Sequence, residues 1–424
     1  MNAYGIFILL ALLVEYVLHC VADVLNVRAL EGAPPEQVVP LYAGGEDERA
    51  RRYVRTATFA GCIERSAALL AVLAFWFAGG FGWLDGIVRL CLSGEVARGL
   101  AYIGLLALAY TALGIPFDVH RTFGVEARFG FNRTTWRTFV TDRLKGLALA
   151  ALIGGPLLAG VLLLFLRAGE SAWLLCWVVV VAFSLVTQWL GPALILPLFN
   201  RFDPMPEGEL RQGILAYASS VRFPVQNLYV VDGSRRTSKA NAYFTGLGRR
   251  RRIALFDTLI NRHSVGEVVA VLAHEVGHYK RRHVLQGLLL ASAHAGLALF
   301  LLNYFLGRPG LYEALFYQQP SVYAGLVAFA LLYTPVESFL SVLVNGISRR
   351  QEFEADRYAV STAPQPAELG AALRTLSVTS LAHPNPHPFY VVLNYTHPPL
   401  ARRLEAIEAA LRGRAVGRES RVRP

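Results

Sequence analysis

The feature that most limits the fold of this chain is a series of long apolar runs. A helical run of about 20 apolar residues crosses the hydrocarbon core of a bilayer, and seven runs of that length occur here. Charged residues make up only 17% of the 424 residues, against about 25% in an average soluble protein. We therefore expect a mainly α-helical, polytopic membrane protein. The expected spans lie near 4–25, 57–80, 97–117, 146–166, 172–197, 284–306 and 322–345.

The arginine content of the connections predicts how the chain is oriented. The first, third and fifth connections are rich in arginine, whereas the others carry few basic residues, such as Arg89, Arg167 and Arg308. Because basic connections stay in the cytoplasm, residues 200–283 and the carboxyl-terminal region are expected on the cytoplasmic side. The same rule accounts for the net charge of +11 without a nucleic-acid partner. The four cysteines have no paired spacing and are expected to be buried small residues.

The pattern divides the chain into four segments. Residues 1–199 are expected to form five transmembrane helices with cytoplasmic loops, and residues 284–346 to form the sixth and seventh. Residues 200–283 are predicted to be a cytoplasmic catalytic segment. It has a helix over 207–221, short strands at 227–231, 242–245 and 252–256, and then a second helix. Residues 347–424 are predicted to be cytoplasmic and helical, mainly at 366–381 and 399–412.

The second helix of the catalytic segment carries the pattern His274-Glu275-x-x-His278. Residues four apart share one face of a helix, so the two imidazoles lie side by side, as zinc at about 2.1 Å from each nitrogen requires. Glu275 can then take a proton from a water bound to the metal. A chance match is the alternative, but apolar residues at helical spacing precede the motif and favour a packed helix with fixed side chains.

A third metal ligand is expected because catalytic zinc usually has three protein ligands and an open position. Glu352 and Asp356 follow the seventh span and lie four apart on a predicted helix. One of them can bind zinc while the other accepts a hydrogen bond from a ligating imidazole. A solvated acidic face, paired with neighbouring arginines, explains the same residues equally well.

Several motifs in this order resemble the type I CAAX prenyl protease family, which are integral-membrane, a-factor-converting zinc metallopeptidases. The similarity spans essentially the whole chain. It rests on His274-Glu-x-x-His278, Glu352-x-x-x-Asp356, Val231-Asp-Gly-Ser234, Asn241-Ala-Tyr-Phe244 and His397-Pro-Pro-Leu400 followed by Arg403-Leu404.

The resemblance implies a helical barrel around a water-filled chamber, closed at one end by a small α+β catalytic domain of zincin type. It implies that His274, His278 and Glu352 bind one Zn²⁺, with Asp356 and Arg403 supporting them. It also implies that His397 stabilises the oxyanion, and that Asn241, Ala242 and Tyr243 lie on an edge strand that pairs with extended substrate. From the residues alone, His397 fits a turn before two prolines. Glu354 departs from the eukaryotic pattern and could compete with Glu352 as a ligand.

The predicted function is peptide-bond hydrolysis by a zinc endopeptidase, with Glu275 as general base, acting on peptides or proteins with or without a lipid. Removal of residues after a prenylated cysteine is what the resemblance implies. Quality control of damaged membrane proteins is the nearer alternative, and a non-catalytic, zinc-stabilised transporter or scaffold the farther one. The Arg- and Ala-rich, Lys-poor composition suggests a bacterial protein and therefore an inner membrane.

Overall fold

Seven helices of the described chain are long and apolar enough to cross a membrane. The computed structural model describes residues 1–42, 46–240, 242–245 and 252–422. The spans are α1 (Ala3–Ala29), α2 (Glu46–Phe77), α4 (Glu95–Val119), α5 (Trp136–Leu149) continuing through a π-helical turn into α6 (Gly155–Arg167), α7 (Ala172–Leu194), α12 (His283–Leu306) and α14 (Val322–Thr362). The seven spans predicted from hydropathy are therefore confirmed.

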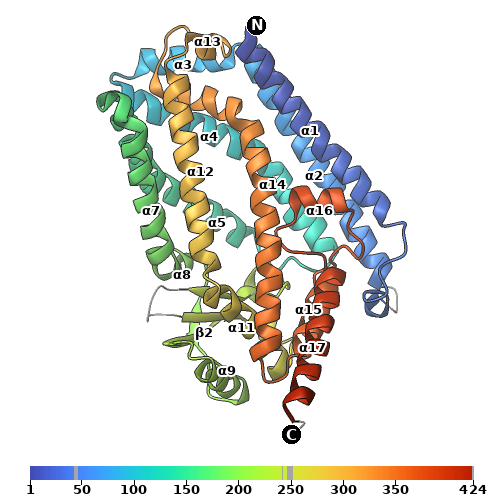
Figure 1. Cartoon of the computed structure of the whole chain (residues 1–424). Helices are drawn as coiled ribbons and strands as arrows, with labels where there is room; N and C mark the ends of the chain where they lie inside the picture. The colour runs from blue at the N-terminus through green and yellow to red at the C-terminus, as the bar shows by residue number, and fades with distance from the viewer. Residues whose placement is uncertain (43–45, 241, 246–251, 423–424) are drawn as a thin grey trace.

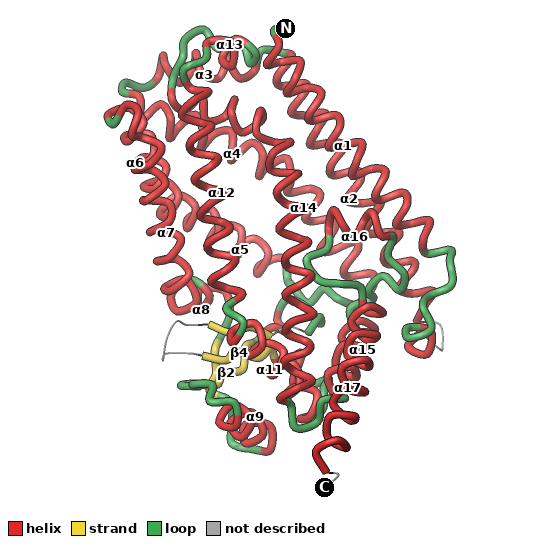
Figure 2. Tube along the Cα trace, viewed as in Figure 1, coloured by secondary structure: helices red, strands yellow, loops and turns green. Residues whose placement is uncertain are grey.

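The long helices stand side by side around the molecule, with the strands gathered at one end (Figures 1 and 2). None of the residues in the most apolar window of α2 or of α12 is buried, although a helix inside a solid bundle would bury at least one face. The helices therefore form the wall of a barrel, with one face towards lipid and the other towards the interior.

The end of the barrel near the amino terminus is closed by two short helices, α3 (Gly80–Cys91) and α13 (Pro309–Glu313). Trp76 is fully buried here and donates through Nε1 to the carbonyl of Ala314 at 2.7 Å. The hydroxyls of Tyr102 and Tyr317 are 2.7 Å apart. Neither short helix was expected from hydropathy, because each is too short to span and is held by packing against the ends of its neighbours.

The opposite end carries a four-stranded sheet, with strands in the order β1-β2-β4-β3. The strands are β1 (Phe202–Pro204), β2 (Asn227–Val231), β3 (Ala242–Thr245) and β4 (Arg252–Phe256). β2 and β4 are parallel, whereas β1 and β3 pair antiparallel with their neighbours. The three predicted strands have the predicted limits, and β1 is an additional short strand. β3 lies at one edge of the sheet, so its outer side has no strand beside it within the described residues.

Helices α9 (Glu209–Ser220), α10 (Asp257–Ile260) and α11 (Val265–Lys280) accompany the sheet. Leu228, Ile253 and Leu255 of the strands form one buried cluster with Leu272 and Val276 of α11. Burying side chains of this size contributes about 1.5–3 kcal/mol each, so α11 is fixed firmly on the sheet.

The carboxyl-terminal segment contains α15 (Glu368–Thr379), α16 (Pro388–Asn394) and α17 (Leu400–Val422). His383 joins this segment to the first membrane helix, because its Nε2 donates to the carbonyl of Asn26 at 2.8 Å. α14 runs without a break from the membrane into the catalytic end, and the domain boundary predicted at 346/347 falls inside it. All four cysteines are free, but only Cys176 is buried; Cys20 and Cys62 are partly exposed and Cys91 is exposed, so the prediction that all are buried is confirmed for Cys176 alone.

Candidate active site

Helix α11 presents the predicted metal-binding motif from a well-defined start. Ser264 accepts from the backbone N–H of Glu267, and the Glu267 carboxylate accepts from the backbone N–H of Ser264, which is a complete capping box. The apolar residues of α11 pack on the sheet, so His274 and His278 are held towards α14. The local sequence therefore fixes both the beginning of the helix and the direction of its two imidazoles.

Three donor groups converge between α11 and α14. Nε2 of His274 lies 3.1 Å from Nε2 of His278. Glu352 lies between them, with one oxygen 3.4 Å from the His274 nitrogen and the other 3.3 Å from the His278 nitrogen. One donor atom from each of the three residues lies within 4.8 Å of the others.

This donor set fits a metal ion. Ligands about 2.1 Å from a tetrahedral centre are roughly 3.4 Å from one another, and the observed spacings are close to that value. One Glu352 oxygen, Oε2, is buried and has no hydrogen-bond partner. An unpaired buried carboxylate oxygen is costly, and a cation between the three residues would satisfy it.

A buried ion-pair network surrounds the donors. Nδ1 of His274 lies 2.8 Å from Asp356 Oδ1, and Arg403 donates to both Asp356 oxygens at 2.7 and 2.9 Å. Burial lowers the pKa of His274, but the neighbouring carboxylates of Asp356 and Glu352 outweigh it and raise the pKa to about 9. The pocket therefore favours positive charge at this point, which a metal ion can supply in place of the proton.

A glycine between the two histidines allows α11 and α14 to meet. A Cβ at Gly277 would lie only 3.0 Å from Cα of Ala355 and 3.1 Å from Cβ of Tyr358. Any larger residue would push α14 away and separate Glu352 from the imidazoles. Gly277 was not identified from the sequence, although its place inside the metal-binding motif was a usable signal.

The predicted catalytic residues lie beside the donor set. Burial raises the pKa of Glu275, with the imidazoles of His274 and His278 opposing the shift. A raised pKa suits a carboxylate that takes up a proton and returns it. His397 has a 64% exposed side chain, and its Nε2 is 3.3 Å from Glu352 Oε1.

The position of His397 depends on an arginine that the sequence did not reveal. Arg349 lies one turn before Glu352 on α14 and donates to the carbonyls of Val391 and Tyr395, at 3.0 and 2.6 Å. These carbonyls belong to the end of α16, just before the turn that carries His397. Arg349 therefore ties this turn to the helix that supplies Glu352.

The structure describes only two of the three predicted substrate-binding residues. Asn241 lies outside the described residues, whereas the backbones of Ala242 and Tyr243 belong to edge strand β3. Glu354, the competing ligand, does not join the donor set, because it faces His283 and Arg350 instead.

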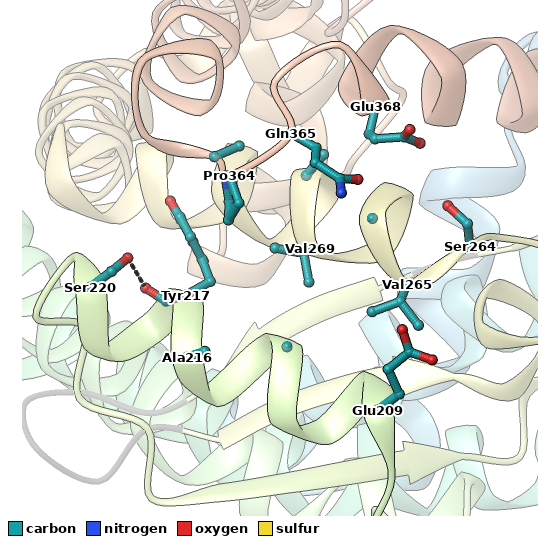
Figure 3. Close-up of a pocket in the computed structure, with 14 residues that line it drawn as sticks. Glu209, Ala216, Tyr217, Ser220, Ser264, Val265, Val269, Pro364, Gln365 and Glu368 are labelled. Carbon is teal, nitrogen blue, oxygen red and sulfur yellow. Dashed lines mark hydrogen bonds between the residues drawn. The ribbon is translucent and has the colours of Figure 1, made fainter.

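Two cavities lie near the site. One, of about 430 Å³, is lined by His397 and Arg403 among others. Another, of about 710 Å³, lies at the start of α11 between α9 and the turn after α14 (Figure 3). Glu209, Tyr217 and Gln365 line the larger one, but none of the three donors does, so it is separate from the candidate metal site.

Comparisons with known proteins agree with this architecture. Residues 23–201 match the family model described as CAAX prenyl protease N-terminal, five membrane helices, and residues 204–411 match peptidase family M48. A CAAX prenyl protease 1 homolog of Oryza sativa is 34% identical over 416 residues, which cover 95% of this chain and 97% of the rice protein. The chain belongs to the CAAX prenyl protease 1 family.

A second member of the CAAX prenyl protease 1 family has a similar identity over a smaller part of the chain. CAAX prenyl protease 1 of Saccharomyces cerevisiae is 35% identical over 341 residues, which cover 76% of this chain and 74% of the yeast protein. A crystal structure of S. mikatae Ste24p matches with a TM-score of 0.89 at 29% identity, covering 96% of this chain and 100% of that chain. The predicted family, the helical barrel with a zincin-type domain and the metalloprotease activity are therefore confirmed.

Proposed function

We propose that this membrane metalloprotease is a zinc enzyme that removes carboxyl-terminal residues after a prenylated cysteine, at the cytoplasmic face of the membrane. The observation that carries the proposal is the converging donor set of His274, His278 and Glu352, with its unpaired carboxylate oxygen. The specificity is inferred from the relatives, which bear the name CAAX prenyl protease 1. The arginine-rich connections support the cytoplasmic placement.

In this proposal His274, His278 and Glu352 hold the ion. A zinc ion bound there would lower the pKa of a coordinated water towards about 7 and polarise the scissile carbonyl. Glu275 takes the proton from the attacking water as the new C–O bond forms, and later gives it to the leaving amine as the C–N bond breaks. His397 donates a hydrogen bond to the oxygen that becomes negative in the transition state.

The remaining predicted residues position these groups and the substrate. Asp356 fixes the ring of His274 through its Nδ1, and Arg403 holds Asp356 in place. The open side of β3, which includes Ala242 and Tyr243, pairs with an extended peptide, and Asn241 precedes that strand in the sequence. The four-segment division and the bacterial inner-membrane location stay predictions from composition, and the relatives named above are eukaryotic.

The test is Glu275→Gln in the purified full-length chain. The farnesylated CAAX peptide should be cleaved about 10²–10⁴-fold more slowly, while bound zinc stays at the wild-type amount. Wild-type rates in this variant would refute the mechanism. Faster cleavage of an unmodified, misfolded membrane protein than of the farnesylated peptide would favour quality control instead.

Orientation has its own test. In a chain whose four native cysteines are replaced by serine, cysteines introduced singly at Gln319 and at Arg412 should differ in labelling by an impermeant thiol reagent added to intact cells, with only the first accessible. The reverse pattern would place the active site outside.

A further inference from the structure

The outer nitrogen of His278 faces a second histidine. Nδ1 of His278 lies 2.9 Å from Nδ1 of His283, the first residue of α12. On its other side, Nε2 of His283 lies 3.3 Å from a carboxylate oxygen of Glu354 on α14. Arg350 donates to the other oxygen of Glu354 at 3.3 Å. A chain of contacts therefore joins α11, α12 and α14 and ends on a residue of the donor set.

The positions of the hydrogens in this chain follow from the donor set. When His278 binds a metal through Nε2, its hydrogen sits on Nδ1, so Nδ1 of His283 must accept. The hydrogen of a neutral His283 then sits on Nε2, where it faces the Glu354 carboxylate. In this series of contacts each donor of a hydrogen bond then faces an acceptor. With the hydrogens reversed, Nε2 of His278 would carry one and could not bind the ion.

The two ligating imidazoles are thus supported in parallel ways. Asp356 contacts the outer nitrogen of His274 directly, whereas Glu354 reaches that of His278 through His283. Glu352 and Asp356 are four apart and share a face of α14, but Glu354 is only two residues from each and points elsewhere. An intervening imidazole is what lets this third carboxylate act on the site.

The backbone is bent to place His283. Arg282 has φ +58° and ψ 32°, a left-handed conformation that costs a residue with a side chain about 1–3 kcal/mol. The bend ends α11 and begins α12, and it brings His283 back beside His278. The His283 side chain is only 3% exposed, so its ring has little freedom to turn away.

We propose that His283 and Glu354 are positioning residues, which fix the ring orientation and the tautomer of His278 and so strengthen its bond to the metal. The proposal rests on the proposed function, because it requires His278 to bind the ion through Nε2. Outer partners of this type typically change metal affinity by about 10–100-fold.

The test measures zinc affinity of the full-length chain in detergent, by competition with a chromogenic chelator. His283→Ala should lower affinity about 10–100-fold, and Glu354→Ala by about tenfold. His283→Asn, which restores an acceptor near the place of Nδ1, and Glu354→Gln, which keeps an acceptor for His283, should each recover part of the loss. Visible spectra of the cobalt(II)-loaded variants should change in the same order. His294→Ala on the same helix is the matched control and should keep wild-type affinity.

The outcomes separate this inference from the proposed function. A wild-type chain that binds no zinc, or that keeps its affinity in His278→Ala, overturns the proposed function. Zinc loss in His278→Ala with wild-type affinity in His283→Ala overturns the inference alone. If His283→Ala does not fold, Glu354→Ala decides, since its side chain is 24% exposed and tolerates change. A zinc affinity within about twofold of wild type in Glu354→Ala would show that Glu354 is not a positioning residue for His278.

Discussion

Each end of the barrel buries a carboxylate against an arginine, but the two carboxylates differ in whether both oxygens accept a hydrogen bond. At the closed end, Asp85 accepts from Tyr323 at 2.5 Å and from Arg89 at 2.9 Å, so both oxygens are satisfied. At the catalytic end, Glu352 lies among three imidazoles and Arg403, and its Oε2 lacks a hydrogen bond. A buried charge therefore does not by itself identify a functional site, and Glu352 is distinguished by an oxygen without a hydrogen bond together with two imidazoles at ligand spacing.

The two ends also differ in how they are built. The closed end is made of packed aromatic residues, in which Trp76 donates to the carbonyl of Ala314 and the hydroxyls of Tyr102 and Tyr317 bond each other. The catalytic end brings together α11, α14 and the turn with His397, which are far apart in the sequence. We therefore expect changes at the first end to affect stability and changes at the second to affect metal binding and rate.

The largest effect is expected for Glu352→Gln. The amide replaces a charged ligand, so zinc affinity should fall strongly and the rate by roughly 10³-fold or more. Metal content and peptide cleavage measure both. Wild-type zinc affinity in Glu352→Gln would contradict the expected difference between the two ends.

Asp85→Asn is the matching change at the closed end. It leaves the Arg89 guanidinium without its buried anionic partner and should cost about 3 kcal/mol of stability. Thermal unfolding in detergent measures this loss. Zinc affinity should stay at the wild-type value, and a parallel loss of zinc would show that the two ends are coupled.

Gly277→Ala should weaken the site through packing. The new methyl group meets the backbone of Ala355, which costs about 1–3 kcal/mol, and the displaced α14 should reduce zinc affinity and rate by about 10–100-fold. Gly104→Ala in α4 is the control, since nothing lies within 4 Å of its added Cβ. That variant should keep full activity, and equal losses in both variants would argue against close helix approach as the cause.

The smallest effect concerns His383, which ties the catalytic end to α1. Burial lowers its pKa, while the hydrogen bond to the Asn26 carbonyl opposes the shift. The unfolded chain therefore binds more protons, so this contribution to stability is present above the ordinary pKa of 6.5 and is lost as pH falls below it. Unfolding midpoints at pH 7.5 and 5.5 should differ less in His383→Gln than in the wild type. An unchanged difference would exclude His383 as the cause.

The sequence predicted the membrane spans and three strands because both depend on local pattern. Helix α3 and the unbroken length of α14 were not predicted, since Phe81 and Val88 are held by distant aromatic neighbours and α14 continues past its apolar part. His274 and His278 were expected together because four residues on a helix bring them together. Glu352 required either the resemblance or the structure, because 74 residues separate it from His278, and no local period reports such a contact.

The continuity of α14 has a mechanical consequence. About 45 Å of continuous α-helix separates Val322, at the far end of the barrel, from Glu352. A 5° tilt of this helix about Val322 would move Glu352 by about 4 Å, which is more than the spacing between neighbouring donor atoms. A long spanning helix can adjust to a change in bilayer thickness by tilting, so we expect lipid composition to influence the geometry of the metal site.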